Sequence, residues 1–169
     1  MKHPELFSAI YALNPCCLLP RRVTADSARN YERLTPEQVA KGDFGIRTTF
    51  AVADAWSPDP NMPPFYADLP TTNGEINPLV IAKWDANAPV AMLAQYVPAM
   101  RSMTAIGMET GLKDFVRADV EAMHHELLRF GIKHDWAVHD GDHGSRVSER
   151  LESVVFPFFA RHLVFPAAK

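Results

Sequence analysis

The clearest pattern of hydrophobic and polar positions lies in the second half of the chain. It predicts a strand, a helix, a strand and a helix at residues 103–108, 115–130, 134–139 and 145–163. The first run is short and almost wholly apolar, the second strand alternates polar with apolar residues, and both helices place apolar residues three and four positions apart. Gly131 predicts the end of the first helix, and Pro157 predicts a kink or break in the second. This alternation is typical of a parallel sheet with crossover helices, and therefore of an α/β fold.

Residues 1–98 are less regular because they hold twelve of the fourteen prolines, which remove a backbone donor and interrupt helices and central strands. Residues 2–7 fit the end of a helix, and residues 8–13 fit a further strand. Beyond them the pattern predicts a helix opened by a capping box at residues 35–38, a short helix at 47–56, an exposed loop at 54–70, and a helix at 78–100 broken at Pro89 and Pro98. We interpret residues 18–98 as a lid-like insertion within one domain that spans residues 1–169.

Composition narrows the class of protein. With 47% hydrophobic and 22% charged residues, the chain resembles an ordinary globular domain, which argues against disorder, collagen and coiled coil. A formal net charge of -3, with no basic cluster larger than Arg21-Arg22, argues against a nucleic-acid partner. No apolar run approaches the roughly 18 residues that span a bilayer, and no signal peptide is visible, so we expect no membrane partner and take the cytoplasm as the default compartment. Cys16 and Cys17 are the only cysteines, and because neighbours rarely pair, a disulfide scaffold is excluded.

Candidate chemistry lies in the loops that follow two neighbouring predicted strands, at residues 109–114 and 140–144. In open α/β sheets, ligands bind at that edge. There Asp114 and His143 would form a hydrogen-bonded pair, in which the carboxylate orients an imidazole that is ready to deprotonate a hydroxyl. We expect their side chains to approach to about 2.6–3.2 Å. Each also has a structural interpretation, since Asp114 is placed to cap a helix and His143 is placed as an ordinary loop histidine.

A metal site is an alternative for residues 139–143, which are dense in ligand atoms. They partly resemble the His-x-His-x-Asp-His box of metallo-β-lactamase-like hydrolases. However, Val138 and Asp140 stand where the first two histidines of that box would be. The match fails at half of its ligands, so the sequence predicts no bound metal and no other cofactor.

Several stretches resemble the esterase D-like family of α/β-hydrolases. Residues 2–10 are similar to the segment that follows the nucleophile helix in that family, and Gly111-Leu112-Lys113-Asp114-Phe115 is similar to its Gly-x-x-Asp-Phe stretch. Residues 130–132, Gly141-Asp142-His143 and residues 157–163 resemble its final strand, histidine loop and closing helix. The resemblance implies a partial α/β-hydrolase fold, with Asp114 as the triad acid and His143 as the catalytic histidine of a serine esterase. The acid also precedes the histidine in the chain, as it does in that fold.

The nucleophile of such a triad is missing from the sequence. None of the serines stands in a Gly-x-Ser-x-Gly frame, and in the family the nucleophile and the oxyanion-hole donors precede the segment that opens this chain. Other residues of this chain are disfavoured as the nucleophile. Ser145 lies too close to His143 in the chain and is better placed to cap the last helix. The prolines around Cys16 and Cys17 favour a loop over the tight turn that a cysteine nucleophile needs.

We therefore expect the C-terminal portion of a carboxylic-ester hydrolase, with a nucleophile serine upstream of Met1 and a small-molecule ester or thioester as its substrate. The alternatives are a non-catalytic binding or structural remnant, whose insertion binds a small acyl or aromatic ligand, and metal-assisted hydrolysis at residues 139–143. A half-sheet would also leave the strand at residues 8–13 with an unpaired edge. We expect that edge to be covered by a second copy of the chain, by an upstream fragment, or by part of the insertion.

Overall fold

The computed structural model describes residues 1–20, 23–24 and 30–163, and the chain divides into two compact units. The first unit comprises Met1–Leu18 and Met92–Lys169, and the second comprises Leu19–Ala91. Among the described residues, no helix has both the length and the apolar character needed to cross a bilayer. The insertion predicted at residues 18–98 contains the second unit, and its function as a lid stays a prediction.

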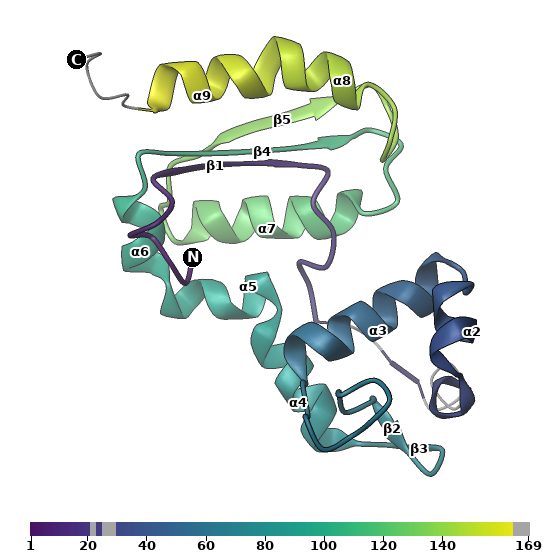
Figure 1. The fold of residues 1–169 in the computed structure, drawn as a ribbon. Coiled ribbons are helices and arrows are strands. Elements are labelled where there is room, and N and C mark those ends of the chain that lie inside the picture. The colour runs from purple at the N-terminus through teal and green to yellow at the C-terminus, as the bar shows by residue number, and fades with distance from the viewer. Residues whose placement is uncertain (21–22, 25–29, 164–169) are drawn as a thin grey trace, which may run out of the picture. The chain divides into compact units, whose positions relative to one another are not determined.

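The first unit is built on a parallel three-stranded sheet (Figure 1). Its strands are β1 (Ala9–Leu13), β4 (Ala105–Gly111) and β5 (Asp135–His139), in the order β1-β4-β5. Leu13 pairs with Glu109, and Gly111 pairs with His139, so the strands run in one direction and end at one edge. The strands predicted at residues 8–13 and 134–139 are confirmed. The strand predicted at 103–108 begins and ends later than expected, because residues 109–111 extend the ladder with β5 instead of opening the loop.

Helices cover both faces of this sheet (Figure 1). α7 (Arg117–Arg129) lies on one face, and α8 (Val147–Arg150), a π-helical turn (Leu151–Val155) and α9 (Phe156–His162) follow one another on the other. Both predicted helices are therefore present, and the chain in this unit is a mixed helical and parallel-sheet structure. The break expected at Pro157 takes the form of the π-helical turn just before it. Proline has no N–H to donate and its ring crowds the preceding turn, which explains why regular α-helical bonding stops there.

Gly107 in β4 leaves room for the aromatic ring of Tyr11, which lies over it on one face of the sheet. Side chains alternate between the faces along a strand, so Met108 is buried on the α7 face while Gly107 lies on the α9 face. A Cβ atom at Gly107 would come within 2.2 Å of the ring of Tyr11 on β1. That ring meets Phe158 of α9 edge-on, with 5.0 Å between the ring centroids. Gly107 is therefore required for the packing that joins β1, β4 and α9.

Strand β1 lies at one edge of the sheet. Within the described part of the chain, β4 is its hydrogen-bonded neighbour, and no segment of the second unit adds a strand beside it. The expectation that the insertion rebuilds the sheet is therefore wrong for the residues that the structure describes. Residues 21–22 and 25–29 of the insertion lie outside them. All five side chains of β1 are half-buried, whereas β4 is buried from Ile106 to Gly111.

The second unit is mainly helical. Its elements are a 3-10 turn (Tyr31–Arg33), α2 (Pro36–Ala40), α3 (Phe44–Trp56), the strands β2 (Thr71–Thr72) and β3 (Glu75–Ile76), and α4 (Pro78–Asn87). Its core consists of Val52, Ala53, Ala67, Val80 and Trp84. Beyond α4, the chain continues through α5 (Pro89–Met92), a 3-10 turn (Leu93–Gln95) and α6 (Val97–Ser102). The breaks expected at Pro89 and Pro98 are thus confirmed, because each proline stands at the start of a new helix.

The capping box expected at the start of α2 is also confirmed. The Thr35 side chain accepts from the Gln38 backbone N–H at 3.3 Å, and the Gln38 side chain accepts from the Thr35 backbone N–H at 2.8 Å. The next helix begins earlier than residue 47, because the Asp43 carboxylate caps it by accepting from the Ile46 N–H at 2.9 Å. Local side-chain capping therefore sets both helix starts.

Two further expectations for the first half need correction, and one element was not predicted. Residues 2–7 form a turn rather than a helix end, since so short a segment cannot repay the cost of starting a helix. The loop predicted at 54–70 is partly buried: Ser57 is fully buried, and its hydroxyl is satisfied there by accepting from the Trp84 indole N–H at 2.8 Å. The hairpin of β2 and β3 was not predicted, although its turn is Asn73-Gly74, both at positive φ, a pair typical of tight hairpins.

Candidate functional site

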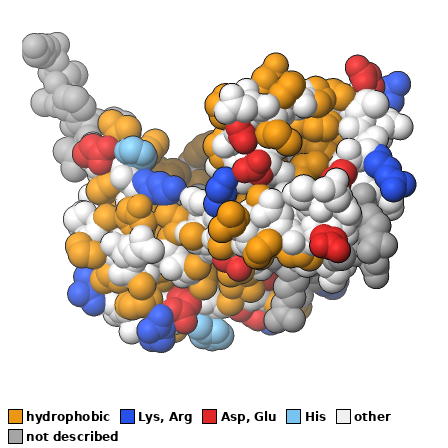
Figure 2. Space-filling model, turned by 90° about the horizontal axis from the view of Figure 1, so that it is seen from below, with side chains coloured by type: hydrophobic (Ala, Val, Ile, Leu, Met, Phe, Trp, Pro, Cys, Tyr) orange, Lys and Arg blue, Asp and Glu red, His pale blue; other side chains and the backbone are white. Residues whose placement is uncertain are grey.

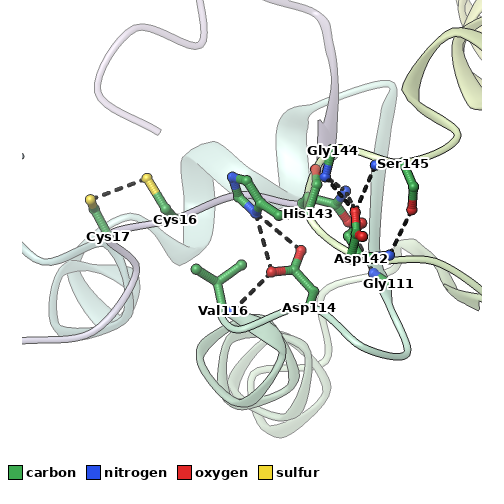
Figure 3. A network of polar contacts seen from close by, with 10 residues as sticks. Cys16, Cys17, Gly111, Asp114, Val116, Asp142, His143, Gly144 and Ser145 are labelled. Atoms are coloured by element: carbon green, nitrogen blue, oxygen red, sulfur yellow. Dashed lines mark hydrogen bonds and ion pairs between the residues drawn. The ribbon is translucent and has the colours of Figure 1, made fainter. Parts of the chain in front are cut away.

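Asp114 and His143 meet at the carboxyl edge of the sheet (Figure 3). Asp114 follows β4, His143 follows β5, and the His143 Nδ1 atom lies 3.1 Å from each carboxylate oxygen of Asp114. The Asp114 side chain is fully buried, while 38% of the His143 side chain is exposed. Because an ionised carboxylate accepts, Nδ1 carries the proton and the Nε2 lone pair is left as the basic atom. The expected approach of the two side chains is present, and their catalytic role stays a prediction.

A second hydrogen bond fixes the rotation of the Asp114 carboxylate. Its Oδ1 atom accepts from the Val116 backbone N–H at 2.9 Å, in the turn that leads into α7. The residue directly before α7 is Val116, so Asp114 is not a simple cap of that helix. The Asp114 carboxylate therefore bonds both to this turn and to His143, and a structural role in the turn is compatible with the predicted catalytic one.

Asn14 ties the three strand ends together. It follows β1 in the left-handed region, at φ 48, and is buried. Its amide Nδ2 donates to the His143 carbonyl at 2.9 Å, its Oδ1 accepts from the Gly111 N–H at 3.0 Å, and its backbone N–H donates to the Glu109 carbonyl at 3.0 Å. Sequence reasoning missed this role. The available signal was an asparagine directly after a strand, since asparagine tolerates left-handed backbone and hydrogen-bonds to nearby backbone groups.

The two loops also bond directly to each other. The Leu112 N–H donates to the His139 carbonyl and the Lys113 N–H donates to the Gly141 carbonyl, both at 2.8 Å. The backbones of the two loops lie so close together that a Cβ atom at Gly111 would be 2.5 Å from the Gly141 oxygen. Any side chain at residue 111 would therefore push the His143 loop away from Asp114.

Asp142 and Ser145 shape the loop that presents His143 (Figure 3). The Asp142 carboxylate accepts from the Ser145 N–H at 2.8 Å and the Gly144 N–H at 3.0 Å, and the Ser145 hydroxyl accepts from the Asp142 N–H at 2.8 Å. These donors, from Ser145 first and then Gly144, lower the pKa of Asp142. The prediction that Ser145 caps the last helix is wrong, because its hydroxyl is used in this turn and Arg146 stands at the start of α8.

Behind the loops, a buried charge network joins β4, α8 and β1. The Glu109 side chain is fully buried and accepts from Arg150 Nε at 2.8 Å, Arg150 Nη2 at 2.6 Å and the Tyr11 hydroxyl at 2.6 Å. Burial disfavours the charge of Glu109, but the bonds from Arg150 and Tyr11 outweigh it and lower its pKa. Burial, followed by the bond to Glu109, raises the pKa of Tyr11. The network fastens α8, and hence the far end of the His143 loop, to the sheet.

The metal interpretation of residues 139–143 finds no support in the geometry. Among the described residues, no group of three or more His, Cys, Asp and Glu side chains is placed to hold a metal ion. Asp142 is used in the loop turn, and His139 is buried with neither ring nitrogen bonded to any described residue. A Cβ atom at Gly141 would lie 2.9 Å from His139 Nδ1, so the neighbouring backbone closes over this ring.

The two cysteines follow Asn14 and Pro15 at the same edge of the sheet. Their Sγ atoms lie 3.2 Å apart, with Cys16 exposed and Cys17 half-buried (Figure 3). The Cys16 thiol is therefore in contact with the Cys17 thiol. This arrangement agrees with the expectation of a loop at this position rather than a nucleophile turn.

Charged side chains do not gather into one basic patch on the face shown in Figure 2, where Lys and Arg lie scattered among hydrophobic and acidic side chains. One exposed apolar side chain lies directly beside His143. Phe115 is 68% exposed, and its ring centroid lies 4.7 Å from that of His143. The surface beside the histidine is therefore suited to contact an apolar group.

Comparison with known proteins gives a match in structure alone. No protein-family model and no curated protein matches the chain. Among solved structures, a ferulic acid esterase is similar over 96% of this chain, with a TM-score of 0.55 and 16% sequence identity. The chain spans 46% of the length of that esterase. The match shows that this chain has an esterase-like α/β fold, and membership of the esterase D-like family stays a prediction.

Proposed function

We propose that this chain supplies the acid and the base of a carboxylic-ester hydrolase of the serine-esterase type. The observation that carries the proposal is the 3.1 Å contact of His143 Nδ1 with the buried Asp114 carboxylate at the carboxyl edge of a parallel sheet. The likeness in fold to part of a ferulic acid esterase supports the same reaction class. The serine nucleophile and the oxyanion-hole donors come from outside this chain, since the sequence holds no Gly-x-Ser-x-Gly.

In this reaction His143 transfers protons and Asp114 holds it in the required tautomer. The Nε2 atom takes the proton of the serine hydroxyl as the oxygen attacks the ester carbonyl, and then gives that proton to the departing alcohol. Water repeats the sequence on the acyl-enzyme, so the serine is restored and the acid is released. Asp114 stabilises the imidazolium that forms in both halves of the cycle. Phe115, exposed beside the histidine, contacts the acyl or aromatic part of the substrate.

The test is the coding sequence directly upstream of Met1, followed by expression of the extended protein. We expect an in-frame Gly-x-Ser-x-Gly and turnover of short p-nitrophenyl esters. Asp114→Asn should reduce kcat by a factor on the order of 10⁴ because the imidazole takes the wrong tautomer, and His143→Ala should reduce it at least as much. His125→Ala, which alters an exposed residue of α7, is the matched control. An extended protein without a nucleophile motif, or turnover that survives His143→Ala, would contradict the proposal.

An assay of the chain by itself is a second test of the proposal. Acid and base without a nucleophile retain little rate enhancement, because the residues of a triad act as a unit. We expect its hydrolysis of p-nitrophenyl esters to equal that of its own His143→Ala variant. Turnover that disappears in Cys16→Ser or Ser145→Ala would show that a local nucleophile had been overlooked.

A non-catalytic binding protein is the second candidate function. It is favoured by a cavity of about 310 Å³ within the second unit, whose lining includes the apolar side chains of Leu34, Met62 and Phe65. A cavity of this size suits a small acyl or aromatic ligand. Calorimetric titration with ferulate and with short fatty acids tests this function, and binding that is lost in Phe65→Ala while His143→Ala leaves it intact would favour it over hydrolysis.

A further inference from the structure

The adjacent thiols of Cys16 and Cys17 form a cluster that ester hydrolysis does not use. Their Sγ atoms lie 3.2 Å apart on the loop after β1, and Cys17 adopts a left-handed backbone at φ 61. Neighbouring side chains on extended backbone point to opposite sides. The left-handed residue brings both thiols to the same side of the chain instead (Figure 3). Cys16 is exposed to solvent and therefore open to a small reagent.

We propose that Cys16 and Cys17 form a redox-active vicinal dithiol, which a low-molecular-weight disulfide converts into one intrachain disulfide, and that closure of this ring acts on the loop carrying His143. The site takes a small, exchangeable disulfide such as oxidised glutathione as its substrate. The inference rests on the two cysteines and Asn14, and it does not depend on ester hydrolysis.

The chemistry proceeds by two exchange steps. The exposed Cys16 thiolate attacks one sulfur of the reagent, which forms a mixed disulfide and releases one thiol. The Cys17 thiolate then attacks Cys16 Sγ and releases the second thiol. Two electrons pass from the cysteines to the reagent, and the two cysteine protons end on the released thiols. The 3.2 Å contact places the second thiol at the sulfur that it must attack.

The ring that forms is readily opened again. Neighbouring Cα atoms are about 3.8 Å apart across a trans peptide, whereas disulfides usually join Cα atoms roughly 4.4–6.8 Å apart. A bridge outside that range is strained and more easily reduced, which is typical of regulatory rather than structural disulfides. This agrees with the exclusion of a disulfide scaffold from the sequence.

Asn14 connects this segment to the candidate site. It lies two residues before Cys16 and donates to the His143 carbonyl at 2.9 Å and to the Asp142 carbonyl at 3.4 Å. Ring closure fixes the Cys16–Cys17 peptide and shifts the backbone that leads into Asn14. Because Asn14 is buried and bonded to both strand-end loops, such a shift is transmitted to the backbone of His143.

The first experiment is intact-mass spectrometry of the whole chain after incubation with oxidised glutathione. We expect the wild type to lose two hydrogen masses, to carry no glutathione and to recover its mass on treatment with dithiothreitol. Cys17→Ser, which keeps the exposed thiol but lacks the second, should retain one glutathione. A wild type that keeps glutathione on either cysteine, or keeps two titratable thiols, would overturn the proposed ring closure.

The second experiment measures the histidine ring signals by NMR before and after oxidation. The His143 signals should move in the wild type and stay in place in Cys17→Ser treated alike, with the exposed His125 as an internal reference. Ring closure without any change at His143 would overturn the link between the two sites. Neither readout requires turnover, so their failure is distinct from failure of the proposed function.

Discussion

Replacing Arg150 by methionine tests how the fold holds a buried carboxylate beneath the candidate site. The Glu109 side chain has no exposed area and that of Arg150 is 16% exposed. Arg150→Met removes two of the three hydrogen bonds to the carboxylate, at 2.8 and 2.6 Å, and leaves the one from the Tyr11 hydroxyl at 2.6 Å. Methionine fills much of the same volume, so the change is mainly one of charge and hydrogen bonding.

The expected loss is large. Removing one partner of a buried ion pair costs about 3–5 kcal/mol, because the other charge stays buried and uncompensated. In a chain of this length each kcal/mol lowers Tm by about 2–4 °C, so Tm should fall by about 6–20 °C. The matched control is Arg117→Met, which breaks a 2.7 Å pair with Glu121 whose side chains are 38% and 35% exposed. Such surface pairs contribute only about 0–1 kcal/mol.

Thermal melts and urea titrations followed by circular dichroism measure both variants. The double variant Glu109→Leu/Arg150→Met should recover much of the loss, because apolar residues often replace a buried pair without net cost. The pH dependence gives a further check. The pKa of Glu109 is lowered in the folded state, so the pair stabilises the fold above the ordinary value of 4.5 and this stability is lost as pH falls through the folded pKa. A single Arg150→Met variant as stable as Arg117→Met would refute the reasoning.

Three further predictions follow from other contacts. Asn14→Ala leaves the Gly111 N–H and the His143 carbonyl without their partner, so urea titration should show a loss of about 1–3 kcal/mol; Asn14→Gly, which suits the positive φ, should show a similar loss if the amide is the cause. Burial, followed by the charges of two neighbouring histidines, lowers the pKa of His124, so its contribution to stability is present above about pH 6.5 and declines as pH falls through the folded pKa. His124→Gln should flatten that part of a Tm-against-pH curve, and an unchanged curve would contradict this. The edge of β1 that pairs with no other described strand should pair with a second copy, so sedimentation should show concentration-dependent association, and a stable monomer at all concentrations would argue against it.

The elements that sequence reasoning predicted well are those with strong local signals. The helix at Arg117–Arg129 has regular apolar spacing and a following glycine, and the start of Pro36–Ala40 has a complete capping box. The predicted strand ends before Ala105–Gly111 does, because a charged residue such as Glu109 is more typical of a loop. Glu109 is accommodated inside the strand by Arg150, 41 positions away, and by the Tyr11 hydroxyl. Long-range pairing of this kind leaves no local signal.

The candidate site also has features with a local sequence signal and features without one. Asp114 and His143 could be predicted because each follows a recognisable strand, and strands in a parallel sheet end at the same edge. Asn14 has a local signal as an asparagine after a strand, but its partners could not be predicted, since they lie 97 and 129 positions away in the chain. The role of Ser145 was mistaken because a serine before a helix is usually a cap, whereas here the neighbouring Asp142 turn uses its hydroxyl.

Asp114 and His143 are positioned by contacts within the first unit. Asn14 joins the three strand ends, the close approach at Gly111 joins the two loops, and the Glu109–Arg150 pair fastens the helix that follows His143. All of these residues belong to the first unit, which comprises Met1–Leu18 and Met92–Lys169. Asp114 and His143 are therefore preorganised without any nucleophile-bearing segment. It follows that the tautomer and orientation of His143 can be measured on this chain alone. Under the proposed function, turnover depends on what supplies the hydroxyl and the oxyanion donors, whereas this hydrogen-bonded pair does not.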